Sequence, residues 1–152
     1  MKSVPPLRLE RASYPVQTVI QTRVSDLDGN GHLNAIRIAQ IYEEGRAIFH
    51  RDHLRRRVRT LVAQLTVRYL HEGFWPEEVI MGVGVAAAGR TSFHMAQAMF
   101  QSGRCIGLCD TVLVCNEGGV SVPIPAEVRA RMAALALPGV SIAPASEPAV
   151  AG

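Results

Sequence analysis

One helix pattern followed by a series of strand patterns limits most strongly how this chain can fold. Between residues 34 and 49, apolar residues recur at spacings of three and four, which is typical of one face of an amphipathic helix. Strand patterns follow over residues 61–70, 77–88, 91–101 and 104–116. Only two-residue turns separate the last three of these stretches. Short turns between long strands predict antiparallel neighbours.

A further strand is predicted over residues 14–24, and a short terminal helix over residues 125–137. One helix cannot cover both faces of a five-stranded sheet, so the sheet should curve and leave its outer face or an edge for a partner chain. Gly45 lies on the apolar helix face, where a missing side chain lets the helix approach the sheet closely. We expect an α+β fold, a curved antiparallel sheet of about five strands wrapped around one long helix, in a homodimer or homotetramer.

The length of 152 residues is that of one ordinary domain. Residues 1–13 contain two adjacent prolines and are expected to form a loose N-terminal arm. Residues 14–137 are expected to form a single domain that includes the short C-terminal helix. Residues 138–152 have the composition of a flexible tail.

The composition, with 48% apolar and 19% charged residues, is that of a soluble globular chain. The longest apolar stretch, residues 79–89, is too short for a membrane-spanning helix, which needs about 20 residues. The N-terminal residues have no apolar core of the kind found in signal peptides. We therefore expect a cytoplasmic protein that does not act on a membrane.

Arginines concentrate between Arg51 and Arg59, in the stretch RDHLRRRVR. This run is either a solvated loop or a docking patch for an anionic group, such as a phosphorylated cofactor or an acidic carrier protein. Nucleic acid is not expected as a partner, because the run has no interleaved aromatics and the rest of the chain is nearly balanced in charge.

The sequence predicts neither a cofactor nor a bound metal. Its three cysteines form no CxxC pair. It also lacks a GxSxG nucleophile motif, a P-loop and an HExxH motif.

The densest polar run is SDLDGNGHLN, residues 25–34, between the first strand and the helix. Asp and Asn side chains form Asx-turns and cap helices, so this run is either a turn that starts the helix or an active site made of the same residues. A carboxylate beside a helix start places a base or nucleophile next to backbone hydrogen-bond donors.

The stretch DLDGNGHLN (residues 26–34), followed by YEEGR (residues 42–46), resembles the signature of hotdog-fold acyl thioesterases of the 4-hydroxybenzoyl-CoA thioesterase type. Its Asp-x-Asn-x-His-x-Asn spacing is also similar to plant acyl-carrier-protein thioesterases. The order of strands and helix fits the hotdog fold, so the resemblance covers about residues 14–116. It implies hydrolysis of an acyl thioester of coenzyme A or of an acyl carrier protein (ACP).

The resemblance implies that Asp28 is the catalytic carboxylate, which either activates a water molecule or attacks the thioester directly. It also implies that Asn30 and His32 orient the water or the carboxylate. The oxyanion donors would be backbone N–H groups around Asn34 and Ala35, at the start of the helix.

Gly31 would let the backbone turn and approach the substrate. The resemblance places Arg90 and Ser92 in a turn that contacts the phosphates of coenzyme A, and their guanidinium and hydroxyl groups suit phosphate binding. The alternative for this turn is an ordinary hairpin. Glu44 is a further candidate for substrate binding from the helix.

Three residues depart from the family pattern: Ala35 stands where the family often has asparagine, and Ile38 and Ile41 stand where it often has aromatics. These positions shape the acyl pocket in the family, so the sequence does not specify which acyl group the protein accepts. Two alternatives remain beside hydrolysis, a hydratase or dehydratase of the same fold and a non-catalytic protein that binds acyl thioesters or supports assembly.

Overall fold

The structure is a computed structural model that describes residues 3–55 and 58–145. Residues 56 and 57 of the arginine run and residues 146–152 of the predicted tail lie outside the described residues. The strands are β1 (Val16–Ile20), β2 (Thr60–Tyr69), β3 (Val79–Ala88), β4 (Ser92–Gln101), β5 (Arg104–Glu117) and β6 (Val120–Ser121). The helices are α1 (Ala35–Asp52), α2 (Ala126–Ala134) and the short 3₁₀ helices η1 (Pro6–Leu9), η2 (Arg11–Ser13) and η3 (Val24–Asp26).

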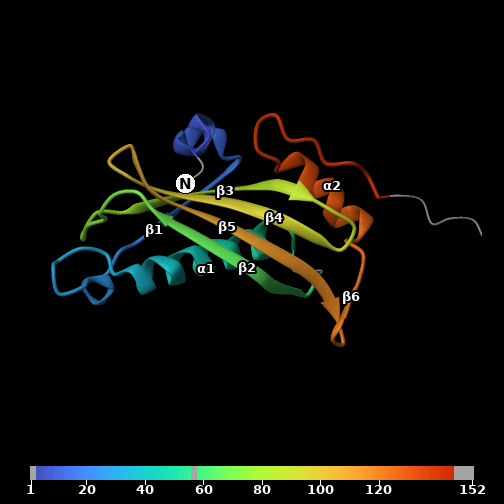
Figure 1. Cartoon of the computed structure of the whole chain (residues 1–152), viewed down its shortest axis with the longest axis horizontal. Helices are drawn as coiled ribbons and strands as arrows, with labels where there is room; N and C mark the ends of the chain where they lie inside the picture. Colours follow the sequence, from blue (N-terminus) through green and yellow to red (C-terminus); the bar gives the residue numbers. More distant parts are fainter. Residues whose placement is uncertain (1–2, 56–57, 146–152) are drawn as a thin grey trace, which may run out of the picture.

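The strands form one antiparallel sheet in the order β1-β3-β4-β5-β2, and β6 pairs with the end of β5. The sheet curves around α1, which lies along its inner face (Figure 1). The predicted α+β fold, a curved antiparallel sheet wrapped around one long helix, is confirmed. β1 is shorter than the predicted strand, because the chain leaves the sheet after Ile20 and turns into η3.

The core lies between α1 and the inner face of β3, β4 and β5. Tyr42 and Phe49 are fully buried on the helix side, and Met81, Met95 and Met99 are fully buried on the sheet side. The methionines adapt their shape to the curved surface of the helix.

Gly45 lies at the closest approach of helix and sheet. A Cβ atom on it would lie 2.8 Å from Cγ of Met81 and 3.1 Å from Nε2 of Gln97, which is too close for an unstrained contact. The predicted role of this glycine is therefore confirmed.

The outer face of the sheet is covered by the N-terminal segment and by α2 with the chain that follows it (Figure 1). Arg8 of η1 donates to Oδ1 of Asp110 at 2.7 Å and to the hydroxyl of Tyr14 at 3.0 Å. Residues of this segment, predicted as a loose arm, thus contact the sheet directly. At the other end, Val85 exchanges backbone hydrogen bonds with Leu135 and Leu137.

The two edges of the sheet differ. β1 has 5 residues, whereas β2 has 10, and no described residue pairs with the outer edge of β2. Leu61, Val62, Leu65 and Tyr69 are all exposed on this strand. A long, apolar and unpaired edge is a ready surface for another strand.

None of the helices in the described part of the chain is long and apolar enough to cross a membrane.

Candidate active site

The polar loop between η3 and α1 folds into a compact turn at the helix start. The N–H of Asp28 donates to the carbonyl of His32 at 2.8 Å, and the N–H of Gly31 donates to the carbonyl of Asp28 at 3.2 Å. Gly31 has a φ of 81°, which favours glycine. The N–H of Leu33 donates to the carbonyl of Gly73 at 2.8 Å, and this bond fixes the loop against the segment after β2.

Asp28 is held in this turn through one carboxylate oxygen. Its Oδ1 accepts the backbone N–H of Asn30 at 2.8 Å and that of His32 at 3.2 Å. These hydrogen bonds, that of Asn30 first, hold the pKa of Asp28 below its usual value. The carboxylate is therefore ionised at neutral pH, and Oδ2 accepts none of the hydrogen bonds found among the described residues.

His32 contacts two residues that follow β2. Its Nδ1 lies 3.3 Å from Oε1 of Glu72, and its ring meets that of Phe74 edge-on at a centroid distance of 5.4 Å. A carboxylate on one ring nitrogen fixes the orientation of an imidazole and leaves the other nitrogen for a ligand. Glu72 was not singled out by the sequence, because its contact with the loop joins segments about forty residues apart in the chain.

The loop, the first turn of α1 and the end of β2 line an open hollow of about 450 Å³. Its lining residues are Asp28, Asn30, His32, Leu33, Ala35, Ile38, Tyr69, Leu70, His71, Glu72 and Gly73. The structure thus brings together all three predicted catalytic side chains with the first residue of the helix. Apolar and polar groups share the lining, as expected for a small-molecule site.

The backbone donors predicted for the oxyanion are not equivalent. The N–H of Asn34 already donates to the carbonyl of Asp26 at 2.8 Å, and that of Gly31 is used within the turn. Oδ1 of Asn34 accepts the N–H of Ile36 at 2.9 Å, so Asn34 caps the helix. The N–H of Ala35, at the first helical position, has no acceptor within the helix and belongs to a residue of the hollow.

Asp26 holds the loop in place by accepting hydrogen bonds from backbone N–H groups. It is buried, its Oδ2 accepts the N–H of Arg23 at 2.8 Å, and its carbonyl accepts that of Asn34. Its second oxygen lies 3.9 Å from Nε of Arg37. The two aspartates of the loop therefore differ, because Asp26 is used by the fold whereas Asp28 lines the hollow.

A buried polar network lies further along α1. Nη1 of Arg46 lies 3.3 Å from Oε1 of Gln97 and 3.4 Å from Oγ1 of Thr111. Nε2 of Gln97 donates to the carbonyl of Tyr42 at 3.0 Å. This network joins the middle of α1 to β4 and β5.

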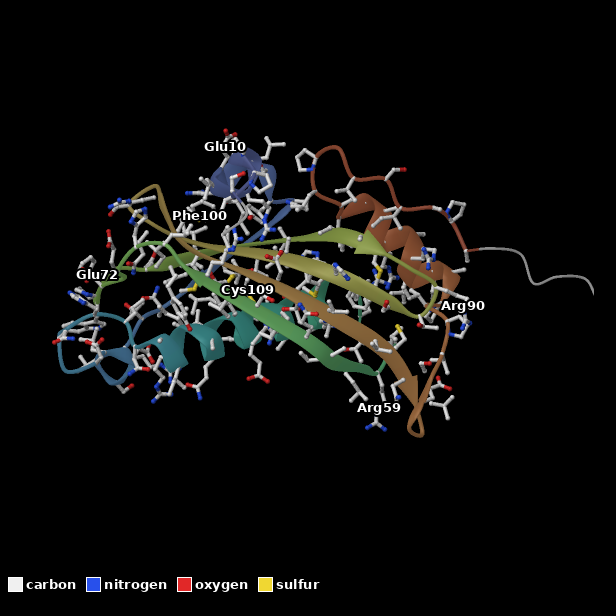
Figure 2. The ribbon with its side chains drawn as sticks, in the orientation of Figure 1. Glu10, Arg59, Glu72, Arg90, Phe100 and Cys109 are labelled. Carbon is white, nitrogen blue, oxygen red and sulfur yellow. The ribbon has the colours of Figure 1, made fainter. Side chains whose placement is uncertain are left out.

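Three predicted substrate-binding residues lie away from this hollow. Glu44 projects from another side of α1 and lines a small hollow with Arg23 and Arg37. Arg90 lies in the turn between β3 and β4, and Ser92 is the first residue of β4. Figure 2 shows Arg90 at the end of the molecule opposite to Glu72. Within one chain, this turn and Asp28 do not meet.

The three residues that depart from the family pattern do not all line the same hollow. Ala35 and Ile38 line the hollow, whereas Ile41 lies beside Glu44. Only the first two can therefore shape the space next to Asp28.

Comparison with known proteins identifies the family. The model of the thioesterase-like superfamily matches residues 22–132, which contain the loop, α1 and all strands from β2 to β6. The chain belongs to the thioesterase-like superfamily. The resemblance to hotdog-fold thioesterases is thereby confirmed.

Solved structures of similar fold include a thioesterase from Thermus thermophilus complexed with coenzyme A and Zn, which is 31% identical, with a TM-score of 0.73 over 81% of this chain and 95% of that chain. A predicted thioesterase from Bacillus stearothermophilus is 28% identical, with a TM-score of 0.73 over 81% and 98% of the two chains. The PA5185 protein from Pseudomonas aeruginosa strain PAO1 is 25% identical, with a TM-score of 0.77 over 86% and 96%. No match was found among curated protein sequences.

Within the described ranges, no group of three or more His, Cys, Asp or Glu side chains is placed to hold a metal ion.

Proposed function

We propose that this protein hydrolyses an acyl thioester to a free acid and a thiol, with Asp28 as the catalytic carboxylate. The observation that carries this proposal is the placement of ionised Asp28 in one hollow with His32, Asn30 and the first N–H of α1. Thioester hydrolysis requires these elements, an anionic base or nucleophile and a donor at the developing oxyanion.

In the general-base route, Asp28 accepts a proton from a water molecule as the water oxygen attacks the thioester carbon. The carbonyl oxygen gains negative charge and accepts a hydrogen bond from the N–H of Ala35, aided by the positive end of the α1 dipole. The C–S bond then breaks, and the thiolate takes up the proton. In the nucleophilic route, an oxygen of Asp28 attacks the same carbon, the thiolate leaves, and water hydrolyses the resulting anhydride. Both routes need Asp28 and Ala35 on the same side of the hollow.

Asn30 and His32 have positioning roles in this proposal. Their backbone N–H groups hold Oδ1 of Asp28, and the imidazole of His32 is in turn held by Glu72. Oδ2 is left to face the substrate or the water.

We further propose that the working form is a homodimer joined through the outer edges of two β2 strands. Two copies of one strand related by a two-fold axis pair in antiparallel fashion, and the apolar side chains of Leu61, Val62, Leu65 and Tyr69 would be covered. The hollow lies at the end of this strand, so its rim would be completed by the second copy.

The direct test is the variant Asp28→Asn, which keeps an Oδ1 acceptor for the loop but removes the charge. We expect kcat for an acyl-CoA substrate to fall by about 10²–10⁴-fold with little change in thermal unfolding. Thiol release across a series of acyl-CoA and acyl-ACP substrates, followed with a thiol-reactive dye, measures it. Asp52→Asn, at the exposed far end of α1, is the matched control and should retain activity.

Near-normal turnover by Asp28→Asn would contradict the role of the carboxylate. Tight binding of acyl-CoA by the unaltered protein without thiol release would instead show a non-catalytic binding protein. Water addition to an enoyl thioester with the thioester left intact would show a hydratase.

A further inference from the structure

A second open hollow, of about 440 Å³, lies beneath the N-terminal segment at the end of β2. This volume is within the range of about 300–1,000 Å³ that is usual for small-molecule sites. Three segments line it: the N-terminal segment with Val4 and Leu9, the end of β2 with Leu70 and His71, and the start of β5 with Arg104 and Cys105. The N-terminal segment that covers it lies on the outer side of the sheet (Figure 1).

This second hollow shares a border with the catalytic hollow. Leu70 and His71 line both of them. The backbone N–H groups of these two residues donate to the carbonyl of Ile106, at 3.0 and 3.1 Å, and so hold the border against β5. The two hollows are therefore neighbours at one end of the sheet, and each has its own further lining residues.

Most of the lining of the second hollow is apolar. Val4 and Leu70 pack against a buried cluster that includes Cys105, and Leu9 is 41% exposed above it. Burial raises the pKa of the Cys105 thiol, so this side chain is neutral and contributes another weakly polar surface. A ligand in this hollow would cover apolar side chains from three separate segments.

The polar side chains of the lining are both basic. Arg104 and His71 are exposed, and none of the ion pairs found among the described residues involves either of them. The described lining contains no carboxylate. Glu72, which follows His71, lies with its Oε1 at 3.3 Å from Nδ1 of His32 in the catalytic hollow. The positive charge of Arg104 therefore has no counterpart within this hollow.

An apolar hollow with one uncompensated guanidinium suits a molecule with an apolar chain and a single anionic head. A carboxylate accepts two parallel hydrogen bonds from a guanidinium group, and a chain of methylene groups gains free energy with each group that leaves water. A nucleotide is disfavoured, because its sugar and base would need polar partners that Val4, Leu9 and Leu70 do not provide.

We propose that this second hollow binds an aliphatic carboxylic acid, with the carboxylate on Arg104 and the chain against Val4, Leu9 and Leu70. Hydrolysis of an aliphatic thioester would release an acid of this class on the other side of Leu70 and His71. The hollow is thus placed to receive the product, and this role rests on the proposed thioesterase activity. Binding of the acid itself requires no hydrolysis and is tested separately.

The first experiment measures binding of linear acids from hexanoate to dodecanoate to the full chain by isothermal titration calorimetry. We expect the affinity to rise about three- to fourfold with each added methylene until the hollow is filled. Dodecanol, which has the same chain without the charge, should bind about tenfold more weakly than dodecanoate. Equal affinity for the alcohol and the acid would contradict the role of Arg104.

The second experiment locates the acid through two pairs of variants. Arg104→Glu should weaken dodecanoate binding by about 10–100-fold, whereas Arg90→Glu, at the opposite end of the molecule (Figure 2), should not change it. Leu9→Asp should weaken binding about tenfold, because it places a negative charge in the lining. Leu7→Asp is its matched control, since Leu7 is an equally exposed leucine of η1 that does not line the hollow.

A variant of the catalytic hollow distinguishes the two sites. Ala35→Phe places a large side chain in the catalytic hollow and should leave dodecanoate binding unchanged. Loss of binding in Ala35→Phe with unchanged binding in Arg104→Glu would show that the acid lies beside Asp28, and would overturn the inference. Failure of every acid to bind would overturn it as well. If dodecanoate binds as expected but no thioester is hydrolysed, the proposed function fails and the second site stands.

Discussion

A single residue of the polar loop combines a structural and a chemical role. Asp28 uses one carboxylate oxygen to close the turn with two backbone N–H groups. The same hydrogen bonds lower its pKa, so the fold itself keeps the group charged. A turn residue and a catalytic residue are therefore compatible descriptions of Asp28, since its two oxygens are used differently.

Asn34 shows the opposite case, in which a loop residue is used almost wholly by the fold. Its Oδ1 caps α1 through the N–H of Ile36. We expect Asn34→Ala to lower the free energy of unfolding by about 0.5–2 kcal/mol, because this N–H loses its acceptor. Chemical denaturation measures the change, and Asn34→Asp, which keeps the cap, should remain close to the unaltered protein. An unchanged midpoint for Asn34→Ala would contradict the capping role.

Gly45 gives a prediction from close packing. Alanine would gain about 1 kcal/mol in helix propensity, but its Cβ would meet Met81 at 2.8 Å. Overpacking of this kind costs about 1–3 kcal/mol, so Gly45→Ala should be destabilising in thermal or chemical unfolding. The cost should shrink when Met81 is already alanine, which a double-mutant cycle detects. A stabilised Gly45→Ala variant would show that Met81 moves aside without strain.

At the level of secondary structure, β2 has a different environment from the other long strands. Its residues are exposed or half-buried along its whole length, and its outer edge has no partner among the described residues. No charged residue occurs between Thr60 and Val67 to discourage pairing. The strand is thus suited to a second copy of itself.

A charge in the middle of this edge should therefore prevent assembly. We expect Leu65→Arg to yield a monomer, because two arginines would face each other across the two-fold axis, and to lose hydrolysis of acyl-CoA with it. Light scattering coupled to size-exclusion chromatography measures the mass. Val19→Arg makes the same change at an exposed position of the short edge strand β1 and should leave assembly intact. A monomeric unaltered protein, or a dimeric Leu65→Arg variant, would rule out this interface.

The features that could be predicted from the sequence are those determined by residues close together in the chain, namely the polar loop at the start of α1 and the long strands. Asp28, Asn30, His32 and Ala35 meet in one hollow because a single tight turn carries them to the start of α1. Strands β2 to β5 were predicted within a few residues, because their alternation and two-residue turns are local signals.

What the sequence did not predict depends on contacts between distant segments. Glu72 and Tyr69 reach the hollow only because β2 ends beside the loop, which no local pattern indicates. The same holds for Arg90, whose distance from Asp28 within one chain follows from the length of β2. The short strand β6 and the 3₁₀ helices η1 and η2 lacked a period long enough to detect.

For the molecule as a whole, the covering of the outer sheet face bears on assembly. η1 is tied to that face by the ion pair between Arg8 and Asp110, and α2 with its following segment lies along β3. A second copy stacked on this face would have to displace both segments. Between the two assemblies that the sequence left open, the open edge of β2 therefore favours the dimer that we propose.

The free edge of β2 also links catalysis to the amount of protein present. If each site is built from two chains, the concentration of sites follows the concentration of dimer rather than of chain. Well below the dissociation constant of the dimer, that quantity varies with the square of the total concentration, so halving the protein would cut turnover about fourfold. A cell that makes little of this chain would then have almost none of its activity, and saturating substrate that bridges two copies would itself favour their association.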